Sequence, residues 1–346
     1  MIRQPGRPFI SIVIPNFNGA ACLGPCLQSL MLQTYQDMEV LVVDNASRDR
    51  SLDIVRNVAP SARILCQEQN LGFAAAVNRG VAEARGGWVA ILNNDTEAAE
   101  DWLAECVAAI GRHPDASYLA CRILEHRDRS RIYSAGDCFL RAGIGYRRGQ
   151  ELPDCADYQR EGPIFSACGC AALYRKTALQ EAGGYDERFF AYLEDVDLGL
   201  RFQAAGKRGY YVPGARVLHI GGATSGGEFS ALAVRLRTRN SILLLLKSLP
   251  GRILWRCLPM ILAAQASWLA RAVGRGRLLS YLRGLAGTLP LARGILEDRR
   301  MLRLAWQSSA AEMWHSILAS EAMARRDFAS DKQHTSRFLR WYFRLF

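Results

Sequence analysis

The chain has 346 residues, 50% of them hydrophobic, and a formal net charge of +11. That length fits one large domain or two modest ones, and the hydrophobic content supports a sizeable core, which excludes a chain that is disordered throughout. The positive charge points to an anionic partner, which could be a nucleic acid, an anionic lipid surface or a phosphorylated substrate, and it does not choose among them.

The residues before the first apolar stretch, 1–8, are polar, so we expect no secretory signal and a reduced, cytosolic setting. The ten cysteines are scattered along the chain, and we expect them to be small buried apolar residues. Cys22 with Cys26 and Cys168 with Cys170 are the only close pairs. Neither has a second ligand pair at zinc spacing, so no metal role is expected for them.

Strand and helix signals alternate along the first hundred residues. Short apolar runs predict strands at 9–15, 40–43, 63–66 and 88–92, and apolar residues at helical spacing predict helices at 20–33, 51–58 and 70–85. This alternation predicts a parallel sheet with helices on both faces. Ligands of such sheets bind at the carboxyl ends of the strands, so the polar residues that follow each strand form the candidate site.

The middle of the chain, 116–172, mixes short strands with glycines, and we expect it to shape the site of a second substrate. An acidic turn that runs into a helix is predicted at 189–205, and one more strand at 210–219.

The composition changes after about residue 230. Apolar stretches are interrupted by arginines and prolines, and no uninterrupted run reaches the roughly 18–20 residues of a membrane-spanning helix. Glu297 and Asp298 are the only acids between Arg235 and Arg303. This basic, amphipathic pattern predicts helices that lie on an anionic membrane surface. The alternative is a helical tail packed on the catalytic domain or on a partner chain. The last stretch, 337–346, mixes arginine with aromatic residues and suits an interface.

Two polar stretches could contact a nucleotide. Asp44 follows the second predicted strand, and its carboxylate could accept a hydrogen bond from the imide N–H of uracil or thymine; the alternative is a cap on the helix near residue 51. Asn70, Gly72 and Phe73 open a helix, where a glycine permits close approach and the helix N-terminus attracts phosphate. The alternative here is again a helix cap.

Two further residues could hold a metal ion. Asp95 ends the fourth predicted strand, where a carboxylate could bind a divalent ion that bridges two phosphates; the alternative is an ordinary turn residue. His219 ends the strand at 210–219, and a neutral imidazole there could bind the same ion; the alternative is a hydrogen-bonded surface histidine.

Glu194, Asp195 and Asp197 form an acidic cluster. Three carboxylates within four residues repel one another unless they are solvated, bound to metal or used as bases. Asp197 and Arg201 are at helical spacing and could pair. The alternative is a solvated helix N-terminus, which the helix dipole favours, although the aromatic flank at 189–193 argues against full solvation.

In their order and spacing these stretches resemble the inverting family 2 glycosyltransferases with the GT-A fold, in particular the bacterial rhamnosyltransferase-like branch that builds surface polysaccharides on lipid carriers. The resemblance covers about residues 8–225. It rests on the stretches 11–18, 42–47, 70–74, 92–95 and 194–197, together with Phe189, Phe190 and His219.

The resemblance implies an α/β fold, a mixed GT-A sheet flanked by helices, in a catalytic domain at 1–228, followed by a basic amphipathic, membrane-associating helical region at 229–346. It also implies a set of nucleotide-sugar-binding residues. These would be Pro15, Asn16, Asn18, Asp44, Asn45, Asn70, Gly72, Phe73, Asn93 and Asn94.

The resemblance further implies the chemical roles. Asp195 would be the general base with Glu194 beside it, and Asp197 and Arg201 would support that turn or the acceptor. Asp95 would bind Mg²⁺ or Mn²⁺ on the diphosphate, with His219 as a second ligand. The family's first metal-motif aspartate is Asn93 here, so metal binding rests on Asp95 and His219.

The expected reaction is a single displacement with inversion at the anomeric carbon of a sugar carried by a dTDP- or UDP-sugar. We expect dTDP-rhamnose as the donor, with a UDP-hexose as the alternative, and a lipid-linked saccharide as the acceptor. The enzyme is expected in the cytoplasm, peripheral on the inner face of the cell membrane.

Four other functions compete with this one. A non-catalytic nucleotide-sugar-binding relative is the main alternative. A nucleic-acid-binding protein is disfavoured, because the basic residues lie among apolar helices and not beside stacking aromatics on a sheet. A nucleotidyltransferase would need a basic residue in the loop after the first strand, and a nicotinamide dehydrogenase a Gly-x-Gly-x-x-Gly there; both are missing.

Overall fold

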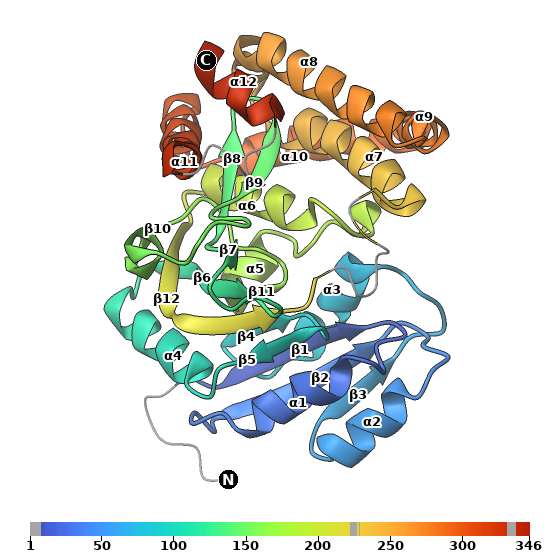
Figure 1. The fold of residues 1–346 in the computed structure, drawn as a ribbon, viewed down its shortest axis with the longest axis vertical. Coiled ribbons are helices and arrows are strands. Elements are labelled where there is room, and N and C mark those ends of the chain that lie inside the picture. The colour runs from blue at the N-terminus through green and yellow to red at the C-terminus, as the bar shows by residue number, and fades with distance from the viewer. Residues whose placement is uncertain (1–7, 222–226, 228, 331–336) are drawn as a thin grey trace.

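The computed structural model describes residues 8–221, 227, 229–330 and 337–346 (Figure 1). The expectation about a secretory signal at the N-terminus and the predicted domain boundary at residue 228 fall largely outside this part of the chain. The strands are β1 (Ile10–Asn16), β2 (Met38–Asp44), β3 (Arg63–Cys66), β4 (Trp88–Leu92), β5 (Thr96–Ala98), β6 (Ala116–Glu125), β7 (Ile132–Ser134), β8 (Asp137–Leu140), β9 (Ile144–Arg147), β10 (Gly162–Pro163), β11 (Ala171–Arg175) and β12 (Arg208–His219).

The helices follow the same order along the chain, with two short 3₁₀ helices, η1 and η2, among them. They are α1 (Leu23–Met31), α2 (Ser51–Val58), α3 (Phe73–Glu83), α4 (Trp102–Arg112), η1 (Ala156–Gln159), α5 (Lys176–Glu181), η2 (Glu187–Phe189), α6 (Glu194–Ala204), α7 (Ala231–Ser248), α8 (Gly251–Gly274), α9 (Leu278–Ala286), α10 (Leu289–Ala305), α11 (Ala310–Ser330) and α12 (Arg337–Leu345).

The main sheet is mixed, with the strand order β10-β12-β6-β11-β4-β1-β2-β3. β1 pairs in parallel with β2 and β4, and β2 pairs in parallel with β3. β11 is antiparallel to both of its neighbours, β4 and β6. The strand–helix alternation predicted the first four strands correctly, and these strands are parallel as expected. The antiparallel β11 makes the whole sheet mixed, as the resemblance implied. Between β6 and β11 the chain runs through short strands, a 3₁₀ helix and loops, which do not impose the parallel direction that a helical crossover does.

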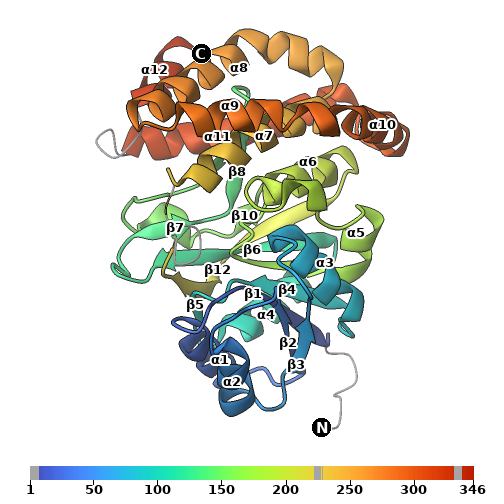
Figure 2. The same ribbon diagram turned by 90° about the vertical axis from the view of Figure 1, so that its right-hand side faces the viewer.

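Both faces of the central strands are covered, as the continuous apolar runs require. Every residue of β1 and β4 is buried. One face packs against α1, α2 and α4, and the other against α3, α5 and α6 (Figure 2). Helix α4 is an addition to the elements expected from the sequence. The side of α4 that packs against the sheet carries the buried residues Trp102, Leu103, Cys106 and Ala109.

Helices α7 to α12 gather at the end of the molecule opposite α1 and α2 (Figures 1 and 2). The β8–β9 hairpin projects into this layer and is fastened to α11. The main-chain N–H of Phe139 in β8 donates to Ser320 Oγ (2.7 Å), and Arg141, just after β8, is paired with Glu321. Just after β9, the main-chain N–H of Gly149 donates to Asp327 Oδ2 (2.6 Å). Much of the C-terminal region is thus packed on the sheet domain, as one of the two interpretations of the sequence expected.

Among the described residues one helix, α8, is long and apolar enough to cross a membrane by length and composition alone. This corrects the expectation that interruptions exclude such a helix, because α8 continues through Pro259. Only 28% of its most apolar window is buried in the molecule. Helix α8 therefore presents an apolar surface outward.

Candidate active site

Three side chains at the carboxyl ends of β1, β2 and β4 form one buried hydrogen-bonded chain. Asn94 Nδ2 donates to Asn16 Oδ1 (2.7 Å), and Asn16 Nδ2 donates to Asp44 Oδ1 (3.0 Å). Asp44 Oδ2 accepts from the main-chain N–H of Ser47 (3.0 Å). Asp44 does not cap α2, whose N-cap is Arg50, so that alternative is wrong. Each oxygen of this carboxylate thus accepts one of these hydrogen bonds and keeps a further lone pair for a ligand.

The loops after β1, β2 and β3 are tied together by the other predicted asparagines. Asn18 has a left-handed backbone (φ 49°), and its Oδ1 accepts from the N–H of Arg48 (2.8 Å). Asn45 Nδ2 donates to the carbonyl of Gly72 (3.2 Å), and Asn70 Oδ1 accepts from the N–H of Gly72 (2.9 Å). Pro15 is a buried residue of β1. Asn70 therefore orders the turn before α3, while Gly72 itself is the N-cap.

Gly72 is required by its position. Its φ is +91°, and a Cβ there would lie 2.6 Å from the ring and the carbonyl oxygen of Phe190. Any other residue would be strained and would push Phe190 away. The first turn of α3, beginning at Phe73, is thus in direct contact with the loop that precedes the acidic cluster.

Asp95 and His219 are brought together although 124 residues separate them. The antiparallel pairing of β5 with β12 places His219 Nε2 3.0 Å from Asp95 Oδ1, and both side chains are buried. No described residue provides a hydrogen-bond partner for His219 Nδ1. A carboxylate and an under-satisfied imidazole fit the oxygen and nitrogen ligands that Mn²⁺ accepts. Asn93 holds the adjacent turn through its main chain, donating to the carbonyl of Cys170 (2.9 Å).

The loop that leads into α6 is strained. Phe190, Tyr192 and Leu193 all have positive φ, between 64° and 71°, and non-glycine residues rarely adopt this conformation unless their surroundings impose it. Asn240 of α7 supplies such surroundings, because its Nδ2 lies within hydrogen-bonding distance of the carbonyl oxygens of Phe189 (2.9 Å), Ala191 (2.9 Å) and Tyr192 (2.7 Å).

Asp195 lies in the first turn of α6 with both carboxylate oxygens fixed. Oδ2 accepts from the N–H of Gly169 (2.9 Å), and Oδ1 accepts from the N–H of Val196 (2.8 Å). Burial outweighs these hydrogen bonds and raises the pKa of Asp195. Burial and the Asp195 charge raise the pKa of Glu194 well above its usual range. A fixed carboxylate with a raised pKa is a stronger proton acceptor, and the raised pKa of Glu194 favours the protonated form of that neighbour.

Asp137 and Cys168 complete this cluster, and Asp137 was not predicted from the sequence. One ligand atom each of Asp137, Cys168 and Asp195 lie within 4.8 Å of one another. Burial, followed by the Asp195 charge, raises the pKa of Asp137 well above its usual range, and burial also raises the pKa of the Cys168 thiol. The spacing could suit a metal ion, but these shifts favour protonated groups and oppose metal binding. No local signal marks Asp137, since β8 approaches α6 only in the folded chain.

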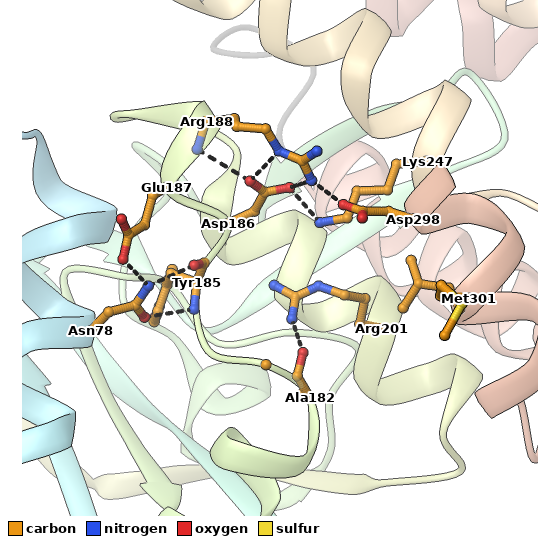
Figure 3. A pocket seen from close by; sticks show the side chains of 12 residues that line it. Asn78, Ala182, Tyr185, Asp186, Glu187, Arg188, Arg201, Lys247, Asp298 and Met301 are labelled. Carbon is orange, nitrogen blue, oxygen red and sulfur yellow. Dashed lines mark hydrogen bonds and ion pairs between the residues drawn. The ribbon is translucent and has the colours of Figure 1, made fainter. Parts of the chain in front are cut away.

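Asp197 points into the protein and not into the cluster with Asp195. Its side chain is fully buried and accepts from Arg201 Nε (2.8 Å), Lys247 Nζ (2.9 Å) and Ser248 Oγ (2.8 Å). Arg201 and Asp197 thus pair as their spacing predicted, and through Lys247 and Ser248 they fasten α6 to α7. Figure 3 shows Lys247 also bound to Asp186 (2.7 Å), beside a cavity of about 500 Å³ that α10 borders.

Comparison with known proteins gives the same picture. Residues 11–183 match the family model described as glycosyl transferase family 2. The chain is 31% identical to an N-acetylglucosaminyl-diphospho-decaprenol L-rhamnosyltransferase of Mycobacterium tuberculosis over 237 residues, which cover 61% of this chain and 75% of the relative. It is 33% identical to a PGL/p-HBAD biosynthesis glycosyltransferase of Mycobacterium bovis over 198 residues, which cover 56% of this chain and 69% of the relative.

Two solved structures share the fold. A mannosyltransferase of Pyrobaculum calidifontis in complex with GDP-Man and Mn²⁺ superimposes with a TM-score of 0.53 at 20% identity, covering 87% of this chain and 86% of that one. TarS 1–349 of S. aureus in complex with UDP-GlcNAc superimposes with a TM-score of 0.56 at 15% identity, covering 92% of this chain and 91% of that one. The mixed sheet with flanking helices is therefore the GT-A fold.

Proposed function

Because the chain belongs to glycosyl transferase family 2 and is a glycosyltransferase of the GT-A fold, we propose that it transfers rhamnose from dTDP-rhamnose to a lipid-linked saccharide in bacterial surface polysaccharide synthesis. The similarity to the mycobacterial relative, a rhamnosyltransferase that acts on a decaprenol-linked sugar, supports this choice. A UDP-hexose is the second candidate donor, because the group that would contact the base accepts either pyrimidine.

The donor end of the site is built by the first three loops. Asp44, held by Asn16 and Ser47, would accept the imide N–H that uracil and thymine share. The diphosphate would lie near the N-terminus of α3, where Gly72 lets the backbone approach and the helix dipole favours negative charge.

Asp95 and His219 would hold a divalent ion on the diphosphate, and the 3.0 Å between Asp95 Oδ1 and His219 Nε2 supports this role because it brings an oxygen and a nitrogen ligand atom side by side. When bound, Mg²⁺ or Mn²⁺ would stabilise the negative charge of the departing nucleoside diphosphate. The Pyrobaculum mannosyltransferase, which has the same fold, was solved in complex with GDP-Man and Mn²⁺.

The observation that carries the proposal is the carboxylate of Asp195, fixed by two backbone amides and raised in pKa by burial. Asp195 would accept the proton of the acceptor hydroxyl as that oxygen attacks the anomeric carbon. The raised pKa of Glu194 favours its neutral form, which would add no second negative charge at the attacking oxygen. A single displacement of this kind inverts the anomeric configuration, through a transition state of oxocarbenium character.

The test is a donor panel on the purified full chain. Each common nucleotide sugar is offered with Mg²⁺ or Mn²⁺, and both nucleoside diphosphate release and thermal stabilisation are measured. Release with one dTDP- or UDP-sugar, lost in Asp95→Ala, supports the proposal and identifies the donor. No response to any donor, with detergent and lipid extract present, would favour the alternative of an inactive nucleotide-sugar-binding relative and would focus attention on Asn93.

We also propose a cytoplasmic enzyme, peripheral on the inner face of the cell membrane, where nucleotide sugars and lipid-linked acceptors meet. The decaprenol-linked substrate of the mycobacterial relative supports this location.

A further inference from the structure

The outward face of α8 is apolar although it faces solvent. Trp255, Leu262 and Val273 are 75%, 59% and 50% exposed, and their spacings of 7 and 11 residues place them on one side of the helix. Pro259 and Ala266 are exposed on the same side. The opposite side of α8 is also apolar and is buried in the molecule. The outer stripe is therefore not part of the protein's own core.

The two helices that follow α8 also expose large apolar side chains. Leu279 on α9 is 61% exposed, and Leu289 at the start of α10 is 76% exposed. Helices α8 and α9 pack against each other, at the end of the molecule farthest from α1 and α2 (Figures 1 and 2). Large apolar side chains left exposed along one side of α8, with more on the next two helices, indicate a contact surface for another body.

The charge around this area has a single sign. Residues 229–296 contain no aspartate or glutamate. All of the arginines on α8, α9 and the turn between them are exposed; they are Arg252, Arg256, Arg271, Arg275, Arg277 and Arg283. At the C-terminal end of α8, Arg271 lies over the Trp268 ring (5.2 Å) and Arg275 over the Phe229 ring (4.9 Å).

This combination selects among the possible occupants. A second copy of the chain, related by a two-fold axis, would bring the same positive surface against itself, which like charges oppose. A bilayer-spanning role conflicts with the packing of α8 against α9, α11 and α12 and with its position across the end of the molecule. An anionic phospholipid surface satisfies both features, because it buries Trp and Leu at the headgroup boundary and attracts arginine.

We propose that the outer face of α8, assisted by Leu279 and Leu289 and by the exposed arginines of α8 and α9, docks on an anionic phospholipid surface. The helix then lies in the plane of the interface, with α1 and α2 at the end of the protein that is remote from the membrane. Only the biological role of this surface rests on the proposed function: docking would bring the enzyme to a lipid-linked acceptor.

The experiment is co-sedimentation of the full chain with vesicles of phosphatidylglycerol mixed with phosphatidylcholine, and with vesicles of phosphatidylcholine alone. The wild-type protein should bind the anionic vesicles, and binding should weaken as salt rises. The double variant Trp255→Glu/Leu262→Glu should bind the anionic vesicles at least about tenfold more weakly. It loses two apolar side chains that would be buried in the lipid, and it gains two negative charges that the anionic lipid repels. The matched control is Leu32→Glu, since Leu32 is 62% exposed at the end of α1. It should bind like the wild type.

Thermal unfolding of all three proteins shows that each is folded. Equal vesicle binding by the wild type and the double variant would overturn the proposal, as would equal binding to both vesicle types. A wild-type dimer in sedimentation velocity that is lost in the double variant would also overturn it, because the surface would then bind a second copy of the chain. Attachment to vesicles that only detergent reverses would overturn it as well, because it would indicate insertion into the bilayer. Donor turnover without vesicle binding would overturn the docking surface alone, while vesicle binding without any donor response would overturn the proposed function alone.

Discussion

Asn240→Ala tests whether the C-terminal helices hold the catalytic turn in place. Asn240 is fully buried on α7. Among the residues that the structure describes, its amide is the side-chain donor for the carbonyls of Ala191 and Tyr192. It also shares the carbonyl of Phe189 with Arg239. Truncation would leave two of these carbonyls without that donor, in a loop that ends one residue before the acidic cluster.

The expected cost follows from these contacts. An amide group has two N–H bonds, and each hydrogen bond contributes about 0.5–1.5 kcal/mol net, so the lost bonds account for about 1–3 kcal/mol. Each residue held at positive φ stores about 1–3 kcal/mol, and three such residues are Phe190, Tyr192 and Leu193. The strain thus equals or exceeds the restraint that the side chain supplies, and the loop should relax once Asn240 is shortened.

A relaxed loop moves Asp195, which follows Leu193 by two residues. A displacement of about 1 Å at a catalytic group costs on the order of 100-fold in rate. We therefore expect kcat to fall about 10- to 100-fold in Asn240→Ala, with a decrease in melting temperature of only a few degrees. Sugar transfer and thermal unfolding measure the two effects. The control is Ser241→Ala on the same helix, whose hydroxyl donates to the carbonyl of Thr238 and accepts a long hydrogen bond from Gln265 of α8 (3.4 Å), away from the strained loop.

Full kcat in Asn240→Ala would refute the positioning role, and so would an equal loss of kcat in Ser241→Ala. A loss of kcat that merely tracked the unfolded fraction would also refute it, because such a loss would reflect stability alone.

Three further predictions concern the buried acids. Burial raises the pKa of Asp195, and the base must be ionised to accept a proton, so kcat/KM should fall as the pH drops through a value above the usual aspartate pKa of about 3.9. Asp195→Asn should remove this acid limb of the pH profile and lower kcat far more than donor affinity. Equal losses of kcat and donor affinity would contradict the base assignment. The raised pKa of Asp137 favours its neutral form, which asparagine resembles, so Asp137→Asn should leave the acid limb in place and the rate within about threefold, which a pH profile checks. Asp197→Ala should lower the free energy of unfolding in urea by about 3–5 kcal/mol, because Arg201 and Lys247 lose a buried partner. Burial alone would raise the pKa of Asp197, but these two cations outweigh it and lower the pKa. The stabilisation is therefore present above the unfolded pKa of about 3.9 and is lost as the pH falls, so the difference in stability between variant and wild type should close in acid.

Much of the donor side of the site could be predicted from short stretches of sequence. Asp44 and Asp95 directly follow apolar strands, and strands of a parallel sheet deliver the residues after them to one edge. Asp195 and Asp197 lie in one turn of a helix, so their proximity is local and visible in the sequence. The pairing of Asp197 with Arg201 follows from the same helical spacing.

The acceptor side and the role of the C-terminal helices needed the tertiary structure. The antiparallel insertion of β11, the approach of Asp137 to Asp195 and the hold of Asn240 on the strained loop all join segments that are distant along the chain. No periodicity marks such contacts, because each depends on which loops close and in which direction a strand enters the sheet.

The sequence alone thus determined the strand–helix alternation, the residues at the strand ends and the basic, acid-free character of 229–296, since these are properties of short segments and of composition. Only the tertiary structure decided which charges are buried together and which apolar side chains stay exposed. Burial determines whether the pKa values of Asp195 and Asp137 are raised and whether Trp255 of α8 stays exposed, and burial is set by packing between elements that are far apart in the chain.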